Sequence, residues 1–253
     1  MTFSKYHGTG NDFILADNRE GNIALSKAQI AHLCHRRFGI GADGLMLLET
    51  AAGADFRMMY YNSDGAESTM CGNGGRCIAA FAKRLGIIED KAAFLAIDGL
   101  HRTAIDEAGI VSLEMIDVEE VTVFASHAIL NTGSPHYVLW VEDVEHTPVF
   151  EEGRRIRKGF SAAGINVNFA QRLSDRKLRV RTYERGVEDE TLSCGTGVTA
   201  AAIAASGTAA GLFSYDIETP GGLLGVSFKK TAKGAAEQVV LRGPATFVFD
   251  GEV

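Results

Sequence analysis

Hydrophobic and polar positions change period several times along the first half of the chain. Ser26 begins an amphipathic segment, residues 26–36, which predicts a helix with a serine N-cap. An Ala-containing segment at 76–85 is followed by Gly86 and predicts a second helix. A turn is expected at 62–65, between these helices. Short apolar or alternating runs predict strands at 13–16, 45–48, 56–61, 94–97, 101–105 and 112–115.

The second half repeats this order of elements. Helices are expected at 153–159 and 198–205. Strands are expected at 137–141, 166–169, 177–183, 216–218, 225–228 and 238–241. Many short strands with one long helix in each half predict an α+β fold, in which a curved, barrel-like and mostly antiparallel sheet surrounds a central helix.

A sequence repeat supports this division into halves. The segment ESTMCGNG at 67–74 returns as ETLSCGTG at 190–197, an offset of 123 residues from Cys71 to Cys194. The same offset relates Thr9-Gly10 to Thr132-Gly133 and Gly41 to Gly164. An offset of about half the chain implies two copies of one unit. We expect one domain at 1–117, completed by the C-terminal segment 243–253, and another at 118–242.

Composition narrows the classes of protein that the chain can represent. The 253 residues are 46% hydrophobic and 23% charged, which is enough apolar material for two cores. A net charge of −7 argues against nucleic acid or an anionic membrane surface as a partner. The polar start lacks a secretory signal pattern, and the apolar stretch 198–210 is too short to span a bilayer. The cytoplasm is therefore the expected location.

Four cysteines are present, and two of them are expected to have only a packing role. No pair has CxxC spacing, and without a signal sequence a disulfide framework is not expected. His32, Cys34 and His35 lie within a predicted amphipathic helix and lack a second ligand pair, so we expect Cys34 to pack in the core instead of binding zinc. Cys77 follows Cys71 by one and a half helical turns and is expected to face elsewhere.

Cys71 and Cys194 combine two properties that suit proton transfer at carbon. Each stands at a predicted helix start, where the positive end of the helix lowers a thiol pKa from about 8.5 toward neutrality. The Gly-X-Gly that follows lets backbone N–H groups approach and hold a carboxylate. One such motif is equally well explained by a structural cysteine. Two motifs in repeat register predict inversion of a carbon centre, with a thiolate removing a proton and a thiol returning one from the opposite face.

The motifs resemble the diaminopimelate epimerases from end to end of the chain. The matching segments are YHGTGNDF at 6–13, GIGAD at 39–43, YNSDG at 61–65, MCGNGGRC at 70–77, GSPH at 133–136, NVNF at 166–169, ERG at 184–186, CGTG at 194–197, TPGG at 219–222 and GPAT at 243–246. The resemblance implies two similar domains with the active site in the cleft between them. It also implies a homodimer that interconverts LL- and meso-diaminopimelate, for lysine and peptidoglycan precursor biosynthesis, without metal, pyridoxal phosphate or nucleotide.

The resemblance also assigns site residues. Cys71 and Cys194 match the two acid/base cysteines. The residues that match those binding the distal amino-acid end of the substrate in the family are Asn11, Asn62, Asn166, Glu184 and Arg185. Those that match the helix starts holding the reacting carboxylate are Gly72, Asn73, Gly195 and Thr196.

Three departures from the family pattern concern substrate binding. Gly44 stands where many members have glutamine, and Ser134 stands where many have asparagine. The loop before Cys194 is one residue longer and contains Glu188-Asp189, which is expected to add negative charge near the site. His136 is expected either to help shape the site or to be a satisfied structural histidine.

Alternative functions remain open at this stage. A related two-cysteine racemase could act on proline or hydroxyproline, although such a substrate has no distal zwitterion for Glu184, Arg185 and Asn62 to hold. Lyases and isomerases of the same fold characteristically lack one or both cysteines. A thiol redox protein could use Cys71 and Cys194 as a reversible disulfide, but the missing CxxC argues against it. A pure binding module would not need two thiols at helix starts.

Overall fold

The computed structural model describes residues 1–253 and divides into two compact units. Unit 1 comprises Met1–Leu113 together with Gly243–Val253, and unit 2 comprises Glu114–Arg242. The sequence places this junction at 117/118, and the structure places it at 113/114.

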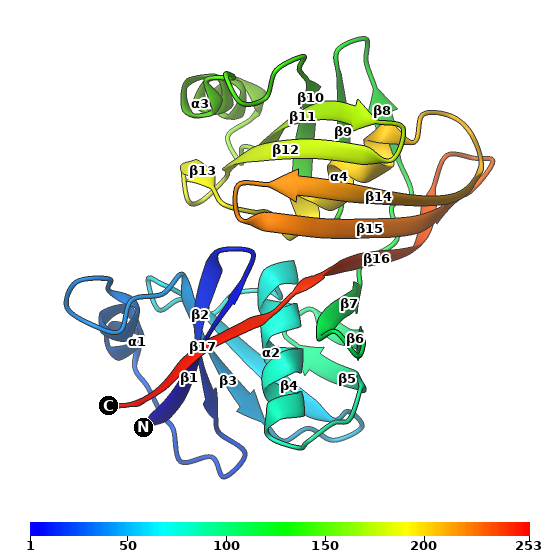
Figure 1. The fold of residues 1–253 in the computed structure, drawn as a ribbon. Coiled ribbons are helices and arrows are strands. Elements are labelled where there is room, and N and C mark those ends of the chain that lie inside the picture. The colour runs from blue at the N-terminus through cyan, green and yellow to red at the C-terminus, as the bar shows by residue number, and fades with distance from the viewer. The chain divides into compact units, whose positions relative to one another are not determined.

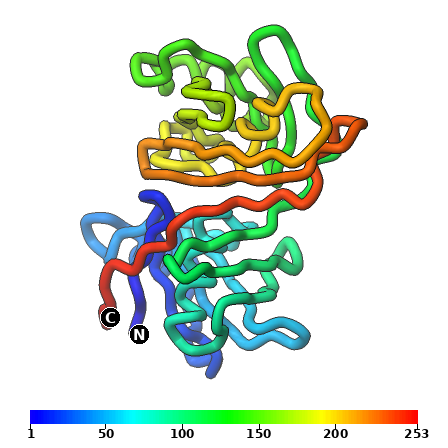
Figure 2. Tube along the Cα trace, turned by 45° about the vertical axis from the view of Figure 1, so that its right-hand side comes forward, coloured from blue at the N-terminus to red at the C-terminus, as the bar shows by residue number.

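Unit 1 has two helices, α1 (Lys27–Cys34) and α2 (Gly72–Arg84). Its strands are β1 (Thr2–Gly8), β2 (Asn11–Asp17), β3 (Gly44–Glu49), β4 (Phe56–Asn62), β5 (Lys91–Ala96), β6 (Gly99–Ile105), β7 (Ile110–Glu114) and β17 (Thr246–Glu252). Strand β17 pairs with β1 in antiparallel register, so the last strand of the chain completes the unit that the first strand begins. The two chain ends accordingly lie side by side (Figure 2).

Unit 2 also has two helices, α3 (Val149–Phe160) and α4 (Gly195–Ala205). Its strands are β8 (Val121–Val123), β9 (His127–Asn131), β10 (Pro135–Trp140), β11 (Asn166–Ser174), β12 (Lys177–Glu184), β13 (Asp189–Thr191), β14 (Gly211–Thr219), β15 (Gly222–Lys230) and β16 (Ala236–Pro244). Figure 1 shows α4 enclosed by the strands of this unit. No helix in the structure is long and apolar enough to cross a membrane.

The two units share one topology. In unit 1, β1–β2 is antiparallel, β2–β3 parallel, β3–β4 antiparallel, β4–β5 parallel and β5–β6 antiparallel. In unit 2, the pairs β9–β10, β10–β11, β11–β12, β12–β14 and β14–β15 follow the same alternation. The repeat seen in the sequence is therefore a repeat of structure, and the predicted α+β fold is confirmed.

Strand β3 of unit 1 is buried on both faces, because one helix lies on each side. On β3, Leu45 and Leu47 pack in the cluster that includes Ile30 of α1. Met46 points the other way, and its Cε lies 2.4 Å from where a Cβ on Gly74 of α2 would be. This explains why residues 45–48 are apolar without alternation.

Unit 2 follows the same rule. On β11, Phe169 packs with Val149 of α3, whereas Ala170 packs in the cluster that contains Val198 and Ile203 of α4. The helix α4 is buried along most of its length, which makes it the central helix of its sheet.

Helix limits differ from expectation mainly at the N-termini. Ser26 caps α1 in a capping box with Gln29, as predicted, but the helix ends at Cys34 instead of residue 36. Helix α2 starts at Gly72, directly after Cys71, so the glycine-rich residues 72–75 before the predicted range 76–85 form its first turn despite their low helix propensity. Helix α4 likewise starts at Gly195, three residues before its predicted limit. Cys34 and Cys77 are both buried in the core, which confirms their packing role.

The contact between α3 and β12 provides a stability test. A Cβ on Gly153 would lie 2.3 Å from Cβ of Tyr183, whereas nothing lies within 4 Å of a Cβ on Gly159 of the same helix. We expect Gly153→Ala to lower the free energy of unfolding by about 1–3 kcal/mol through overpacking. Gly159→Ala should change it by less than about 1 kcal/mol, in the stabilising direction. Urea denaturation followed by circular dichroism compares the two, and equal stability of both variants would contradict this packing.

Candidate active site

Cys71 lies at the N-cap of α2, in extended backbone geometry with φ −105° and ψ 135°. Its Sγ is 3.6 Å from Oδ1 of Asn11, the first residue of β2. The side-chain amide of Asn73 donates to the same oxygen at 3.2 Å. The structure thus brings together three residues that the sequence assigned to the site.

The orientation of Asn11 is set by a charged network behind it. Its Nδ2 donates to Oδ2 of Asp43 at 2.6 Å, and Arg36 pairs with the other oxygen of Asp43 at 2.7 Å. Asp12 joins the network through Arg36 and the buried Lys5. Burial raises the pKa of Asp12, but hydrogen bonds from Arg36 and Lys5 outweigh it and lower the value to about 2. Asp43 was not predicted as a site residue, although it lies at the end of the matched segment 39–43.

Arg76 was also missed, although it lies inside the cysteine motif. Its side chain is fully buried. Its guanidinium donates to the Gly72 carbonyl at 3.1 Å, to Oδ1 of Asn73 at 2.9 Å and to the Pro244 carbonyl at 3.3 Å. It therefore fixes the first turn of α2 and the side chain of Asn73. An arginine in a predicted central helix was the available signal.

Asn62 and Gly44 lie at the same sheet edge as Asn11. Strands β2 and β3 begin there and β4 ends there, with Gly44 opposite Asn62 in the β3–β4 register. Asn62 is exposed. A Cβ on Gly44 would lie 2.5 Å from the ring of Tyr60, so this chain has no room for a glutamine at that position.

Cys194 lies at the N-cap of α4, in the same position relative to its helix as Cys71. Its Sγ is 3.5 Å from the hydroxyl of Thr196, which is 3.3 Å from the hydroxyl of Ser134. Asn166 donates to Ser134 at 3.0 Å and accepts from the backbone N–H of Arg185 at 2.9 Å. Ser134, noted from sequence only as a departure, therefore links the predicted residues of this half.

His136 is fully buried behind Ser134. Its Nε2 lies 2.9 Å from the Ser134 hydroxyl, and its Nδ1 lies 3.0 Å from Nδ2 of Asn168. Burial, reinforced by the charge of Arg185, lowers the pKa of His136 to about 3, so the ring is neutral at physiological pH. Asn168 was not assigned from sequence, yet its Oδ1 lies 2.2 Å from a Cβ on Gly197, which explains why that position is glycine.

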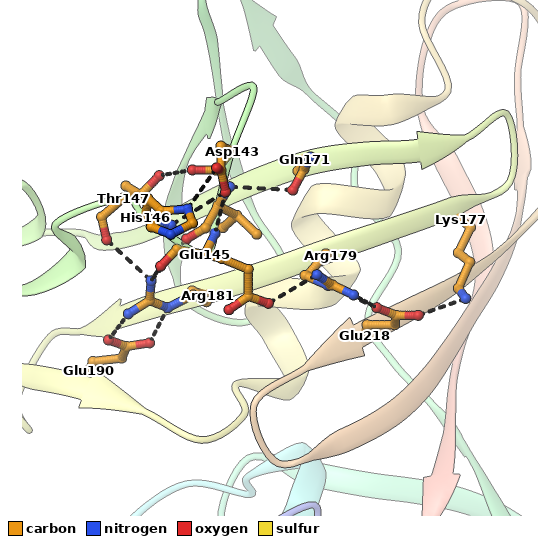
Figure 3. A network of polar contacts seen from close by, with 11 residues as sticks. Asp143, Glu145, His146, Thr147, Gln171, Lys177, Arg179, Arg181, Glu190 and Glu218 are labelled. Carbon is orange, nitrogen blue, oxygen red and sulfur yellow. Dashed lines mark hydrogen bonds and ion pairs between the residues drawn. The ribbon is translucent and has the colours of Figure 1, made fainter.

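The approach to Cys194 is held by ion pairs along β12. Arg181 pairs with Glu190 through two hydrogen bonds of 2.6 and 2.7 Å and donates to the carbonyls of Val144 and Thr147 (Figure 3). It therefore ties β13, which leads to Cys194, to the loop before α3. Lys177, Glu218, Arg179 and Glu145 continue this network along the strand.

In the longer loop, the charge of Glu188 is paired with a neighbouring arginine. The carboxylate of Glu188 pairs with Arg157 at 2.9 Å and accepts from the hydroxyl of Tyr183. These partners lower the pKa of Glu188, with the hydrogen bond from the Gly186 N–H contributing most. Glu184 and Arg185 follow at the end of β12, and the guanidinium of Arg185 contacts the Ala163 carbonyl at 3.4 Å.

Neither half of the site has the features of a metal centre or a disulfide. All four cysteines are free thiols in the structure. No group of three His, Cys, Asp or Glu side chains is placed to hold a metal ion. Each unit offers one thiol at a helix N-terminus, with amides beside Cys71 and hydroxyls beside Cys194.

Comparison with known proteins places this arrangement in a family. Residues 3–118 and 128–248 match the family described as diaminopimelate epimerase. A diaminopimelate epimerase of Flavobacterium psychrophilum is 51% identical over 258 residues, covering 99% of each chain. Among solved structures, a PhzF-family phenazine biosynthesis protein of Bacillus anthracis has a TM-score of 0.79 at 14% identity, covering 100% of this chain and 98% of its own. A hydroxyproline epimerase of Agrobacterium vitis has a TM-score of 0.71 at 16% identity, covering 99% and 91%.

The two structural neighbours share the fold, and the sequence match covers almost the whole chain. The chain belongs to the diaminopimelate epimerase family.

Proposed function

We propose that this protein is an isomerase that interconverts LL- and meso-2,6-diaminopimelate by two-base proton transfer. The observation that carries the proposal is the pair of cysteines at the N-caps of α2 and α4, in repeat register. One cysteine, as thiolate, removes the α-proton, and the other, as thiol, delivers a proton to the opposite face. After one turnover each sulfur has changed its protonation state.

The helix starts are proposed to hold the reacting α-carboxylate. Gly72 and Asn73 begin α2, and Gly195 and Thr196 begin α4. The N–H groups of a first helical turn have no acceptor within the helix and carry a partial positive charge. Such an environment stabilises the additional negative charge that develops on the carboxylate when the α-proton leaves.

The distal amino-acid group is proposed to be held by Asn11, Asn62, Asn166, Glu184 and Arg185. Their mix of amides, a carboxylate and a guanidinium suits a zwitterion, and Arg185 can bind a carboxylate through two parallel hydrogen bonds. Asn11 also contacts Cys71, so it stands next to the reacting centre as well. Proline and hydroxyproline lack a distal zwitterion, which makes them the weaker candidates.

Three further properties belong to the proposal. Catalysis is proposed to need no pyridoxal phosphate or other cofactor, since the two thiols supply the acid and the base. The protein is proposed to act in the cytoplasm as a homodimer. Its product would serve lysine and peptidoglycan precursor biosynthesis.

Removal of either thiol tests the mechanism. Cys71→Ala and Cys194→Ala should each lower the rate of LL-to-meso conversion by at least about a hundredfold, since each removes an acid/base group. Proton NMR of LL-diaminopimelate in deuterium oxide, under reducing conditions, follows conversion and deuterium entry at the α-carbon. Cys34→Ala, which changes a buried thiol of unit 1, serves as the matched control and should retain activity. Full conversion by either catalytic variant would overturn the two-base proposal.

Arg185 tests the assignment of substrate. Loss of a charged hydrogen-bond partner costs about 1.5–3 kcal/mol, so Arg185→Gln should raise KM for LL-diaminopimelate on the order of 10- to 100-fold. Arg155→Gln, which changes an exposed arginine of α3, is the control and should leave KM unchanged. Steady-state kinetics with diaminopimelate, proline and hydroxyproline in parallel distinguishes a diaminopimelate epimerase from a proline or hydroxyproline racemase. Turnover of proline or hydroxyproline in preference to diaminopimelate would reject the proposed substrate.

A further inference from the structure

Equivalent positions beside the two cysteines carry different chemical groups. The 123-residue offset aligns Asn11 with Ser134 and Asn73 with Thr196. The thiol of Cys71 therefore contacts the carboxamide of Asn11, whereas the thiol of Cys194 contacts the hydroxyl of Thr196. A series of hydrogen bonds leads to each sulfur from a group that can only accept or only donate. That group fixes the direction of every hydrogen bond in the series, including the one at the sulfur.

At Cys71 the chain of contacts is fixed at both ends. The carboxylate of Asp43 can only accept, so the atom of Asn11 that faces it is the donor Nδ2. Arg76 can only donate, so Asn73 turns its oxygen to Arg76 and its Nδ2 to Asn11. Both constraints leave Oδ1 of Asn11 as the atom that faces Cys71, at 3.6 Å. That oxygen is an acceptor, which suits a protonated S–H.

At Cys194 the chain of contacts starts at a backbone carbonyl. The Tyr137 carbonyl can only accept, so the atom of Asn168 that faces it is Nδ2. The same NH₂ group donates to Nδ1 of His136. Because this ring is neutral, its single proton is on Nε2, which donates to the oxygen of Ser134.

The rest of this chain leads to the sulfur. The backbone N–H of Arg185 fixes the oxygen of Asn166, so the Nδ2 of Asn166 also donates to Ser134. With its oxygen accepting two hydrogen bonds, the Ser134 O–H is directed to the Thr196 oxygen at 3.3 Å. The O–H of Thr196 then donates to Sγ of Cys194 at 3.5 Å. A donor at this distance favours the charged form of the sulfur.

We propose that the free enzyme holds Cys194 as the thiolate and Cys71 as the thiol, with Thr196 and Asn11 as the positioning residues that set this difference. The catalytic consequence rests on the proposed function. Cys194 would take the α-proton first, and Cys71 would give its proton to the opposite face, which leaves Cys194 as the thiol and Cys71 as the thiolate. The protonation states themselves do not depend on any substrate.

Positive charge does not account for the proposed difference, because the nearby cation Arg76 acts on Cys71. Arg76 interacts electrostatically with Cys71, and Arg185 interacts electrostatically with the ring of His136, which contacts Ser134. Arg76 is the more buried of the two and opposes the proposed difference. However, its N–H groups are directed at oxygen acceptors and act on Cys71 only at longer range, whereas Asn11 is in direct contact.

Several other charged groups on the surrounding elements have partners of their own. Lys5 pairs with Asp12, and Asp98 accepts from the Met70 N–H just before Cys71. Arg172 and Lys230 bind the opposite end of α4, at Ala205 and Ser206. The remaining titratable residues on the strands packed against α2 are Tyr6, His7, Asp17, Glu49, His101 and Arg102. Those on the strands packed against α4 are His127, Tyr137, Lys177, Arg179, Arg181, Tyr183, Glu184, Tyr215, Asp216, Glu218 and Lys229.

Alkylation of the free enzyme over a range of pH tests the proposal. Iodoacetamide labelling, followed by mass spectrometry of the two cysteine peptides, gives a midpoint pH for each thiol that is independent of its accessibility. We expect a lower midpoint for Cys194 than for Cys71 in the unaltered protein. Equal midpoints, or the reverse order, would overturn the proposal, and neither outcome depends on whether the protein turns over diaminopimelate.

Variants identify the groups responsible. Thr196→Val removes the donor at nearly constant volume and should slow Cys194 labelling about tenfold below its midpoint, which corresponds to one unit of pH. Thr196→Ser should restore the midpoint, since it restores the hydroxyl. Asn11→Ala should lower the midpoint of Cys71 and leave that of Cys194 unchanged. An unchanged Cys194 midpoint in Thr196→Val would reject the role of Thr196.

The buried cysteines report whether each variant is folded. Burial raises the pKa of Cys34 to about 11 and that of Cys77 to about 12, so neither should be labelled in a folded protein below pH 10. Labelling of these two thiols in a variant would mark it as unfolded. If a variant is unfolded, the midpoint pH values of Cys71 and Cys194 in the unaltered protein are sufficient to decide the proposal.

Discussion

The close approach of each central helix to its sheet is the constraint on which the rest of the structure depends. At the first turn of α2, a Cβ on Gly74 would lie 2.4 Å from Met46, and at the first turn of α4, a Cβ on Gly197 would lie 2.2 Å from Asn168. Only glycine allows these distances. The close approach places each N-cap cysteine against the edge where β2 or β10 begins, so Asn11 and Ser134 come within the reach of the two motifs.

The same constraint explains the elements that sequence analysis found. A strand between two helices is apolar on both faces, and residues 45–48 show this as an unbroken apolar run. The strand at 177–183 was found by its alternation, because its outer positions carry the ion pairs of Figure 3. Other strands were missed: β8 and β13 are three residues long, β17 is largely exposed, and β1 and β9 have no distinctive period.

The candidate site was predictable only in part. Cys71 and Cys194 were accessible because the repeat marks them, and the Ala-rich segments that follow predicted their placement at helix starts. The partners of Asp43 and Arg76 were not accessible, because hydrogen bonds between residues far apart in sequence exist only once the strands have paired. The neutrality of His136 likewise arises from burial, which a sequence does not display.

The closing strand of unit 1 has a consequence for how the chain reaches its structure. Strand β17 comes from the last residues of the chain, yet it pairs with β1, which is made first. Unit 2 is continuous along the chain and has all its residues once synthesis passes Arg242. Unit 1 must wait with β1 unpaired on one side until the C-terminal residues leave the ribosome. During translation, the half that begins the chain is therefore the last to be completed.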